Sequence, residues 1–433
     1  MSARRVLVFP AGTEIGMEIH SALRLCKEVE LFGAGQSASN HAAFLFEHYH
    51  ILPSIHEEGW LAQLVALCRQ LGIDYIFPAH DDVVVALATH RECIPTVVLT
   101  ASSETCLITR SKSKTYNHLQ SLVRVPRVYA PDGVDQFPLV VKPDRGQGSQ
   151  GVHLVEKRDQ LRAALERVRD GIICEYLPGE EYTIDCFSDR NRGVLFCGAR
   201  ARLRMRNGIA VHTRSVALAG ALDMAKHIGR ALGLHGAWFF QLKRAADGEL
   251  TLLEVAPRIA GSMSTHRIQG VNFPLLTIYE HERLPIRLLL NPGSVELDRA
   301  LRNRYRINLQ FRTLYIDLDD TLLLRGQVNI DALRLVFSCI NRGIEVKLIT
   351  RHAGDLTVTL ARHRLGGLFD KILHLDRTQR KADSIAERDA IFVDDSFSER
   401  WEVHSQTGIP TFDCSMLDAL VETHPSDHKD LST

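Results

Sequence analysis

Short apolar runs and amphipathic stretches alternate over the first hundred residues. Strands are predicted at residues 6–9, 29–35, 73–80 and 96–101, and helices at residues 15–25 and 60–71. Strands that alternate with helices favour a parallel sheet with crossover helices. We therefore expect an α/β domain at the start of the chain.

The pattern changes twice further along the chain. Between about residues 111 and 292 the predicted strands are longer, and glycine and arginine are more frequent. From about residue 304 a regular series follows, with strands at 313–320, 344–350, 371–375, 390–395 and 410–413 and helices at 331–342, 357–364 and near residues 382 and 399. Five strands alternating with four helices predict a small doubly wound domain. Residues 284–304 are the expected linker.

Composition limits the class of protein. A chain of 433 residues exceeds what one core usually supports, so two or three domains are expected. Lysine plus arginine equal aspartate plus glutamate at 52 each, which argues against nucleic acid and anionic membranes as partners. The nine cysteines lack zinc-type or CxxC spacing, and no apolar run is long enough to span a bilayer. We expect a cytoplasmic enzyme that acts on small molecules. A homodimer is compatible with the sequence.

Acidic side chains stand at the ends of two predicted strands of the last series. The strand TLYIDLDD brings Asp317 and Asp319 to the point where the chain leaves the sheet, and the strand AIFVDD ends in Asp394 and Asp395. Open α/β sheets bind ligands at this edge. One carboxylate can attack phosphorus while another carries the proton of the leaving group, and the remaining oxygens suit magnesium.

A hydroxyl and an ammonium group complete this set. Thr350 ends the strand IEVKLIT, and Lys381 lies on the helix predicted near residue 382. Both can bind phosphoryl oxygens. Lys371, just before the strand KILHL, is a competing lysine that fits less well. Residues 322–330 leave room for a flap but not for a cap domain.

These four motifs, in this order over residues 312–415, resemble the haloacid dehalogenase (HAD) superfamily. The resemblance implies that Asp317 is a nucleophile that forms an aspartyl phosphate and that Asp319 is the general acid and base. It further implies that Thr350 and Lys381 bind the phosphate. The implied metal ligands are Asp317, Asp319, Asp394 and Asp395, with Asp394 as the principal one.

The middle of the chain contains a glycine-rich hairpin. In FPLVVKPDRGQGSQGVHLV, Lys142 ends a strand and is followed by Gly146, Gly148, Ser149 and Gly151. Such a loop lets backbone amides approach phosphates. It is not a Walker A motif. Downstream come Glu175 and Leu177, Glu181, and then Gln241, Glu254 and Arg258, the last three around two strands joined by a turn at Asp247 and Gly248.

With TRSKSKTYNHL ahead of it, this set resembles the ATP-grasp superfamily over residues 1–290, including its Rossmann-like leading domain. The resemblance implies that Lys112 and Lys142 bind phosphates and the adenine edge, and that the loop with Gly148 and Ser149 covers the triphosphate. It implies that Glu175, Leu177 and Glu181 hold adenine and ribose, that Gln241 and Glu254 carry magnesium, and that Arg258 stabilises the transferring phosphoryl group. One position departs from the family pattern, because Ala256 replaces a second oxygen ligand.

Two further groups are candidates for substrate binding. Arg202 belongs to the arginine-rich stretch RARLRMRNGIAVHTR, and we expect it to meet an anionic intermediate. His80 and Asp81 follow a strand of the leading domain, at the end expected to face the ATP site.

The sequence therefore predicts a bifunctional enzyme. Its parts are a Rossmann-like domain (1–105), an α+β ATP-grasp domain (106–300), a HAD-like domain without a large cap (305–420) and a tail (421–433). The first two would form a carboxylate–amine ligase with an acyl-phosphate intermediate, and the third a phosphatase. ATP with Mg²⁺, or with Mn²⁺, would be the cofactors, and a carboxylate, an amine and a phosphorylated compound the substrates. Two alternatives stay open for the front half, a nucleotide-binding module without activity and an ATP-grasp kinase.

Overall fold

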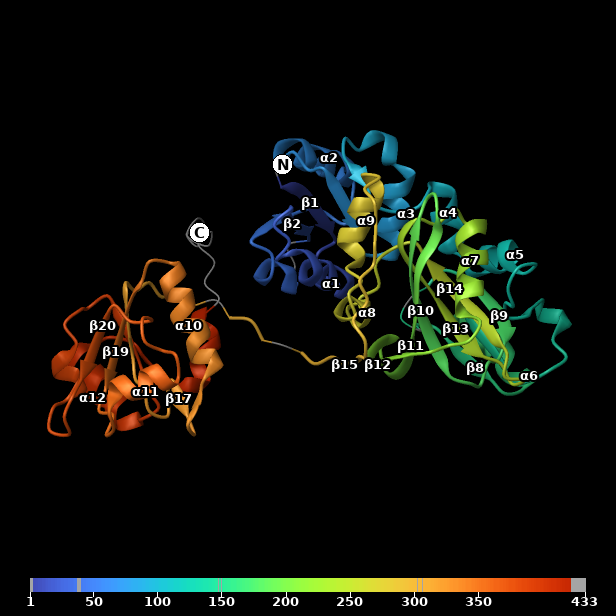
Figure 1. Ribbon diagram of the computed structural model, residues 1–433. Coiled ribbons are helices and arrows are strands. Elements are labelled where there is room, and N and C mark those ends of the chain that lie inside the picture. Colours follow the sequence, from blue (N-terminus) through green and yellow to red (C-terminus); the bar gives the residue numbers. More distant parts are fainter. Residues whose placement is uncertain are drawn as a thin grey trace. The chain divides into compact units, whose positions relative to one another are not determined.

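The computed structural model describes residues 3–36, 40–146, 148, 150–301, 303–305 and 307–421. The chain divides into two compact units, Met1–Leu301 and Arg302–Thr433 (Figure 1). Of the predicted tail, only Val421 belongs to the described residues.

The first unit opens with a parallel five-stranded sheet. Its order is β3 (His48–Ile51), β2 (Val29–Gly35), β1 (Arg4–Phe9), β4 (Tyr75–Pro78) and β5 (Val97–Val98). The helices α1 (Glu14–Leu23), α2 (Trp60–Leu71) and α3 (Asp81–Thr89) connect the strands. In β1, Val6 and Val8 pack into one core while Leu7 and Phe9 pack into another. A strand covered on both faces needs this continuous apolar run.

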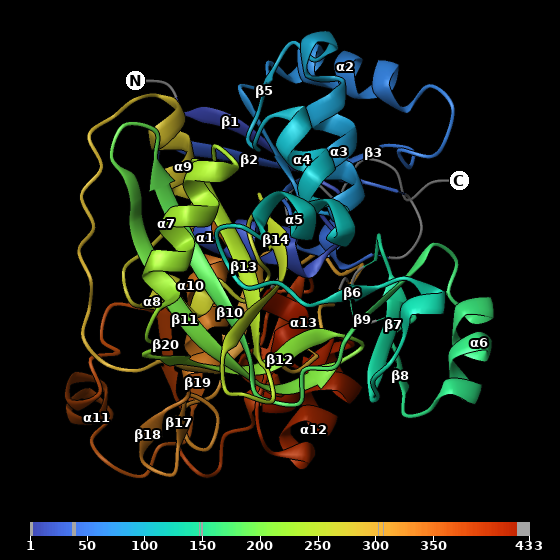
Figure 2. The same cartoon turned by 90° about the vertical axis from the view of Figure 1, so that its right-hand side faces the viewer.

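Two antiparallel sheets follow in the same unit. The small sheet has the order β6 (Val128–Tyr129), β9 (Gly171–Glu175), β7 (Leu139–Pro143) and β8 (His153–Val155). The large sheet has the order β14 (Leu250–Ala256), β13 (Gly236–Arg244), β10 (Glu181–Asp189), β11 (Gly193–Arg206), β12 (Ile209–Val216) and β15 (Glu296–Asp298). The small sheet, with α6 (Arg158–Arg167), lies beside the large one (Figure 2).

Helices cover the two faces of the large sheet. Trp238 and Phe240 of β13 pack with Ala225 and Ile228 of α7 (Ala221–Ala231). On the other face, Phe239 packs into the core that α9 (Phe273–His281) and the leading sheet share, and α8 (Ser264–Ile268) precedes α9 in the chain. The helices α4 (Ser103–Thr109) and α5 (Lys112–Leu119) connect the leading sheet to the small sheet.

A bulge between β13 and β14 sets the direction of one important side chain. Gln241 pairs with Glu254, whereas the next residue, Leu242, pairs with Leu252, so Leu253 is the extra residue. A bulge re-aims the side chains beside it. Glu254 consequently opens into the same cavities as Gln241.

The second unit is a parallel sheet with helices between its strands. The order is β20 (Lys371–His374), β19 (Glu345–Thr350), β16 (Thr313–Ile316), β21 (Ala390–Val393) and β22 (Thr411–Phe412). The main helices are α10 (Ile330–Asn341), α11 (Leu356–Arg362), α12 (Phe397–Thr407) and α13 (Asp418–Val421). A short hairpin of β17 (Leu323–Leu324) and β18 (Gln327–Val328) follows the first strand.

One predicted element of the second unit is different. The helix expected near residue 382 is a single 3₁₀ turn, Lys381–Ser384. Only Ala382 and Ile385 of this stretch pack into the core, and they are three residues apart. One tight turn buries both, so a longer amphipathic helix is not needed.

Candidate functional site

The first unit contains two cavities that share part of their walls. The first, called the inter-sheet cavity, lies between the small and the large sheet and has a volume of about 370 Å³. The second, called the leading-domain cavity, extends towards the leading sheet and has a volume of about 320 Å³. Both are lined by Lys112, Gly148, Arg202, Gln241 and Glu254.

The inter-sheet cavity collects most of the residues predicted to hold the nucleotide. Lys142, Glu175, Leu177 and Glu181 line it together with apolar side chains of both sheets. Oε1 of Glu175 lies 3.1 Å from Arg124, and its other oxygen accepts a hydrogen bond from the backbone N–H of Arg127. The cavity therefore offers apolar walls with a polar rim, as a purine site requires.

Among the described residues, the two lysines of this region donate hydrogen bonds to uncharged oxygens. Nζ of Lys142 donates to the hydroxyl of Tyr116 at 3.0 Å, and that hydroxyl donates to the carbonyl of Leu253. Nζ of Lys112 lies 3.4 Å from the carbonyl oxygens of Pro143 and Gly146. Burial lowers the pKa of Lys112, although Glu254 opposes that shift. An anionic ligand would compensate both ammonium groups.

Two glycines from different segments line both cavities and approach each other closely, and this pair, Gly148 and Gly208, is called the roof. Gly148 (φ 63°) in the glycine-rich loop meets Gly208 (φ 71°) at the turn between β11 and β12. A Cβ on Gly208 would lie 1.8 Å from the carbonyl carbon of Gly148, so this close approach requires glycine. Ser149, the neighbouring residue predicted to cover the triphosphate, lies outside the described residues.

The residues predicted to carry magnesium lie on neighbouring strands. Gln241 and Glu254 are direct partners across β13 and β14 and both open into the two cavities. Burial raises the pKa of Glu254, although Lys112, Arg202 and Arg258 oppose that shift. A divalent cation beside Glu254 would favour the ionised carboxylate, so the pair fits such an ion. Ala256 is buried against the core and supplies no ligand atom.

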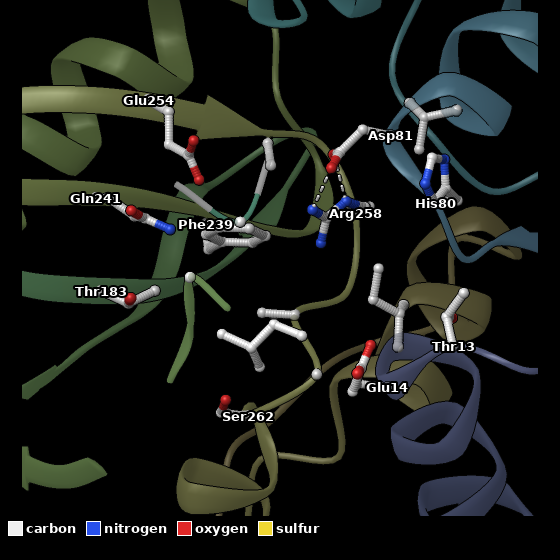
Figure 3. A pocket seen from close by; sticks show the side chains of 18 of the residues that line it. Thr13, Glu14, His80, Asp81, Thr183, Phe239, Gln241, Glu254, Arg258 and Ser262 are labelled. Atoms are coloured by element: carbon white, nitrogen blue, oxygen red, sulfur yellow. Dashed lines mark hydrogen bonds and ion pairs between the residues drawn. The ribbon is translucent and has the colours of Figure 1, made fainter. Parts of the chain in front are cut away.

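Arg258 is held by a carboxylate from the leading domain. Its Nε and Nη2 donate to the two oxygens of Asp81 at 2.6 and 2.8 Å (Figure 3). Burial would raise the pKa of Asp81, but the charge and hydrogen bonds of Arg258 outweigh burial and lower it. Asp81, predicted as a substrate ligand, thus orients Arg258. His80 caps α3 through Nδ1, which accepts from the N–H of Asp82, and it lines the same cavity.

Arg202 is also anchored by the protein. Its Nε lies 3.0 Å from Glu181, and its Nη2 donates to the carbonyl of Gly208 at 2.9 Å. Burial lowers its pKa. Arg202 therefore holds the turn at Gly208 and lines both cavities, so an anion bound there would contact the side chain that holds this turn.

The second unit brings its candidate residues to the carboxyl edge of the sheet. Nζ of Lys381 lies 2.6 Å from Oδ1 of Asp317 and 2.6 Å from Oδ2 of Asp394. Burial and the neighbouring Asp394 raise the pKa of Asp317 to about 7, even though Lys381 opposes the shift. Lys371 is exposed on β20, so the structure places Lys381, and not Lys371, between the two carboxylates.

Three carboxylates converge in this unit. Ligand oxygens of Asp317, Asp394 and Asp395 lie within 4.8 Å of one another, the kind of oxygen cluster that hard cations prefer. The hydroxyl of Thr321 accepts from the N–H of Asp395 at 3.0 Å and braces the cluster. Thr350 is fully buried, and its hydroxyl accepts from the N–H of His352.

Asp319 lies outside that cluster and has a partner of its own. Nδ1 of His352 lies 2.9 and 3.0 Å from its two carboxylate oxygens, and Nε2 of His352 lies 2.9 Å from the hydroxyl of Thr359. Sequence reasoning did not single out His352. Its place directly after the strand that ends in Thr350 was the available signal.

Comparison with known proteins agrees with the geometry of the first unit. Residues 167–286 match the family described as ATP-grasp in the biosynthetic pathway with Ter operon. The chain is 27% identical over 165 residues to a D-alanine–D-alanine ligase of Fusobacterium nucleatum subsp. nucleatum, with 34% of this chain and 56% of that protein covered. The chain spans about half the length of the curated relatives it matches.

Two solved structures have a similar fold. The biotin carboxylase complex from Campylobacter jejuni has a TM-score of 0.57 at 16% identity, covering 67% of this chain and 74% of the other. The L-amino acid ligase from Bacillus licheniformis has a TM-score of 0.53 at 20% identity, covering 64% and 74%. Together with the family match, these likenesses support an ATP-grasp fold for the first unit. No helix of the described residues is long and apolar enough to cross a membrane.

Proposed function

We propose that the first unit is an ATP-dependent carboxylate ligase that works through an acyl phosphate. The observation that carries this proposal is the joining of the two cavities at Lys112, Gln241 and Glu254. A nucleotide in the inter-sheet cavity would direct its terminal phosphate towards this junction. The leading-domain cavity would hold the carboxylate on the other side.

The reaction has two steps. An oxygen of the substrate carboxylate attacks the γ-phosphorus, the bond to the β-phosphate oxygen breaks, and ADP and an acyl phosphate form. An amine nitrogen then attacks the acyl carbon, the carbon–oxygen bond to phosphate breaks, and an amide and inorganic phosphate result after loss of a proton. Positioning and charge stabilisation supply most of the catalysis in such transfers.

The residues of the first unit divide this work. Lys112 and Lys142 would bind phosphate oxygens, because both lack an acidic partner at contact distance among the described residues. Arg258, oriented by Asp81, would stabilise the charge on the transferring phosphoryl group. Gln241 and Glu254 would hold Mg²⁺ or Mn²⁺, which supplies charge neutralisation of the phosphates when bound.

We propose further that the second unit is a phosphohydrolase of the HAD type. Asp317 would attack phosphorus, Asp319 would carry the leaving group's proton, and Lys381 and Thr350 would bind phosphoryl oxygens. Asp317, Asp394 and Asp395 would hold Mg²⁺, which fits the convergence of their oxygens. The carrying observation is the position of Lys381 between the two buried carboxylates.

One observation favours a second candidate for the first unit. Ala256 leaves the metal strand without an oxygen two residues after Glu254, on the wall of the same cavity. A module that binds nucleotide without turnover would tolerate this loss. A kinase that stops at a phosphorylated product is the third candidate.

Magnesium-dependent ADP formation tests the ligase proposal. The assay uses the full chain with Asp317→Asn, which silences the second unit, and pooled carboxylates and amines. We expect ADP only with particular pools, at least about 100-fold less with Glu254→Ala, and no change with Glu249→Ala at the exposed turn. Binding of ATP without ADP formation in any pool would favour the binding module. A stable phosphorylated product in place of an amide would identify a kinase.

The phosphohydrolase proposal has a separate test. Hydrolysis of an aryl phosphate by the full chain should fall at least about 1000-fold with Asp317→Asn, since that change removes the nucleophile. Asp331→Asn, an exposed carboxylate in the first turn of α10, is the matched control. Equal rates for wild type and Asp317→Asn would refute the assignment.

A further inference from the structure

The two ends of the leading-domain cavity have different charged neighbours. Around Glu254, the strongest electrostatic neighbours are Lys112, Asp81, Arg202 and Arg258, all at the predicted transfer centre. Around Arg299, which lines the same cavity, they are Arg200, Glu18 and Glu14. Glu14 and Ser262 lie away from Glu254 across the pocket (Figure 3). Arg299 thus belongs to the end of the cavity remote from phosphoryl transfer.

The large sheet fixes the backbone of Arg299. Strand β15 pairs with β12 from Glu296 to Asp298, and the N–H of Arg299 donates to the carbonyl of Val211 at 2.8 Å, which continues the ladder by one residue. Arg299 therefore reaches the cavity from a strand end of the first unit, after the residues that the family comparison covers.

Arg299 differs from the other arginines of this cavity in its partners. Arg258 pairs with Asp81, Arg110 with Asp82, Arg202 with Glu181, and Arg200 with Asp185, all at 3.0 Å or less. Among the described residues, the side chain of Arg299 has no acidic partner at contact distance. Glu18 is engaged by Arg267 at 2.8 Å, which leaves Glu14 as the nearest unengaged acid.

The two guanidinium groups at this end repel each other. Arg200 is fully buried, and it is the charged group that most opposes protonation of Arg299. Asp185 is already engaged by Arg200 and by Nδ1 of His266, both at 2.8 Å. An anionic group between Arg200 and Arg299 would remove the repulsion and would receive charge-assisted hydrogen bonds.

We propose that Arg299, with Arg200 behind it, binds a second anionic group of the acceptor substrate, remote from the carboxylate that is activated. The substrate class is then a carboxylic acid that carries a further carboxylate or a phosphate ester. This assignment rests on the proposed ligase function. If the second group is a phosphate, the ligation product is a phosphomonoester, and a phosphomonoesterase is the class of enzyme that would consume it.

Anion binding to the full chain tests the assignment. Isothermal titration is carried out with Asp317→Asn protein saturated with Mg²⁺ and a non-hydrolysable ATP analogue, so that the nucleotide's own phosphates occupy the lysines. The probes are inorganic phosphate and, separately, malonate. Arg299→Gln is compared with Arg299→Lys and with Arg230→Gln, an exposed arginine on α7 that lines neither cavity.

For the Asp317→Asn protein, which is the reference and is called wild type at position 299, we expect two phosphate sites, one in each unit. In Arg299→Gln, one of them should weaken by about 10- to 100-fold, the usual effect of losing a charged hydrogen bond. The other, at Lys381, serves as an internal control and should not change. Arg299→Lys should keep most of the affinity and Arg230→Gln all of it. A larger effect on phosphate than on malonate would identify a phosphate ester, and the reverse a second carboxylate.

Two results would overturn the assignment. One is the same affinity for both anions in wild type and Arg299→Gln, and the other is an equal loss in Arg230→Gln. Failure of the ligase proposal would be seen separately, as absence of nucleotide-analogue binding or of ADP formation. The anion titration can be repeated without nucleotide, where the difference between wild type and Arg299→Gln still reports on Arg299.

Discussion

The two candidate sites differ in how their buried lysines are compensated. In the second unit, Lys381 lies 2.6 Å from both Asp317 and Asp394, so positive and negative charges compensate each other within the protein. In the first unit, Lys112 and Lys142 contact uncharged oxygens in the part of the chain that the structure describes, and burial raises the pKa of Glu254. The charges of the second site are thus balanced by the protein itself, whereas the two lysines of the first site have no carboxylate at contact distance among the described residues.

Loss of Lys381 should therefore have the largest effect. In Lys381→Met, two buried carboxylates lose their shared counter-charge, and breaking a buried pair typically costs about 3–5 kcal/mol. We expect the second unit to unfold at much lower denaturant concentration and phosphatase activity to disappear. Lys371→Met, at the exposed lysine on β20, is the control and should leave both unchanged. Unfolding of the full chain, followed by circular dichroism, measures the effect. Similar stability of the two variants would show that Lys381 is not an essential counter-charge for the two buried carboxylates.

Away from the inter-sheet and leading-domain cavities, the first unit also contains a compensated ion pair. Glu280 is buried, lies 2.7 Å from Arg190 and 3.5 Å from His235, and these partners outweigh burial and lower its pKa to about 2. A lowered pKa means that the unfolded chain takes up the proton first as pH falls. The stabilisation is complete above the ordinary glutamate pKa of about 4.5 and is lost as pH falls towards 2, with a total of about 3 kcal/mol.

Replacing Glu280 should remove that pH dependence. We expect Glu280→Gln to lower the free energy of unfolding at pH 7 and to flatten its fall between pH 4.5 and pH 2. Urea titrations at several pH values measure the slope. Glu249→Gln, at an exposed turn, is the matched control. An unchanged slope in Glu280→Gln would show that this ion pair does not set the acid stability.

How far these sites followed from the sequence depends on whether the order of strands alone brings the residues together. Asp317, Asp394 and Lys381 were predictable as a group because parallel strands bring their carboxyl ends to one edge. The partners that depend on packing were not. The place of His352 after a strand end puts it at the same edge, but its pairing with Asp319 depends on side-chain packing. Arg258, after β14, meets Asp81 at the start of α3, and the sequence pattern does not indicate that contact.

Strands without a regular pattern of apolar residues could not be predicted from the sequence either. Strand β3 reads HYHI and lies at a sheet edge with half-exposed side chains, so it lacks the alternation that marks a buried strand. The contribution of Arg299 depends on β15, a three-residue strand that completes the large sheet from the stretch interpreted as a linker.

Loss of Lys142 should have the opposite pattern to loss of Lys381, with little effect on stability and a clear effect on ligand binding. Its ammonium group donates to the hydroxyl of Tyr116 and lies over that ring, and it has no acidic partner at contact distance among the described residues, so Lys142→Met should cost at most about 1 kcal/mol of stability. Binding of ATP should weaken by about 10- to 100-fold, because a charged phosphate contact is lost. Titration with a fluorescent ATP analogue measures this, with Lys114→Met on α5 as the control. Severe destabilisation would mean that Lys142 is already compensated without ligand.

The smallest expected effect concerns the roof of the first site. Gly208 and Gly220 both have φ near +70° to +80°, but only Gly208 has a neighbour that a Cβ would strike, whereas Gly220 faces open space. Gly208→Ala and Gly220→Ala should share the backbone strain, of about 1 kcal/mol. Only Gly208→Ala should also push the turn away from Gly148 and so raise the KM for ATP several-fold. Its effect on stability should be close to that of Gly220→Ala. Equal KM values in the two variants would show that closure of the roof is not part of nucleotide binding.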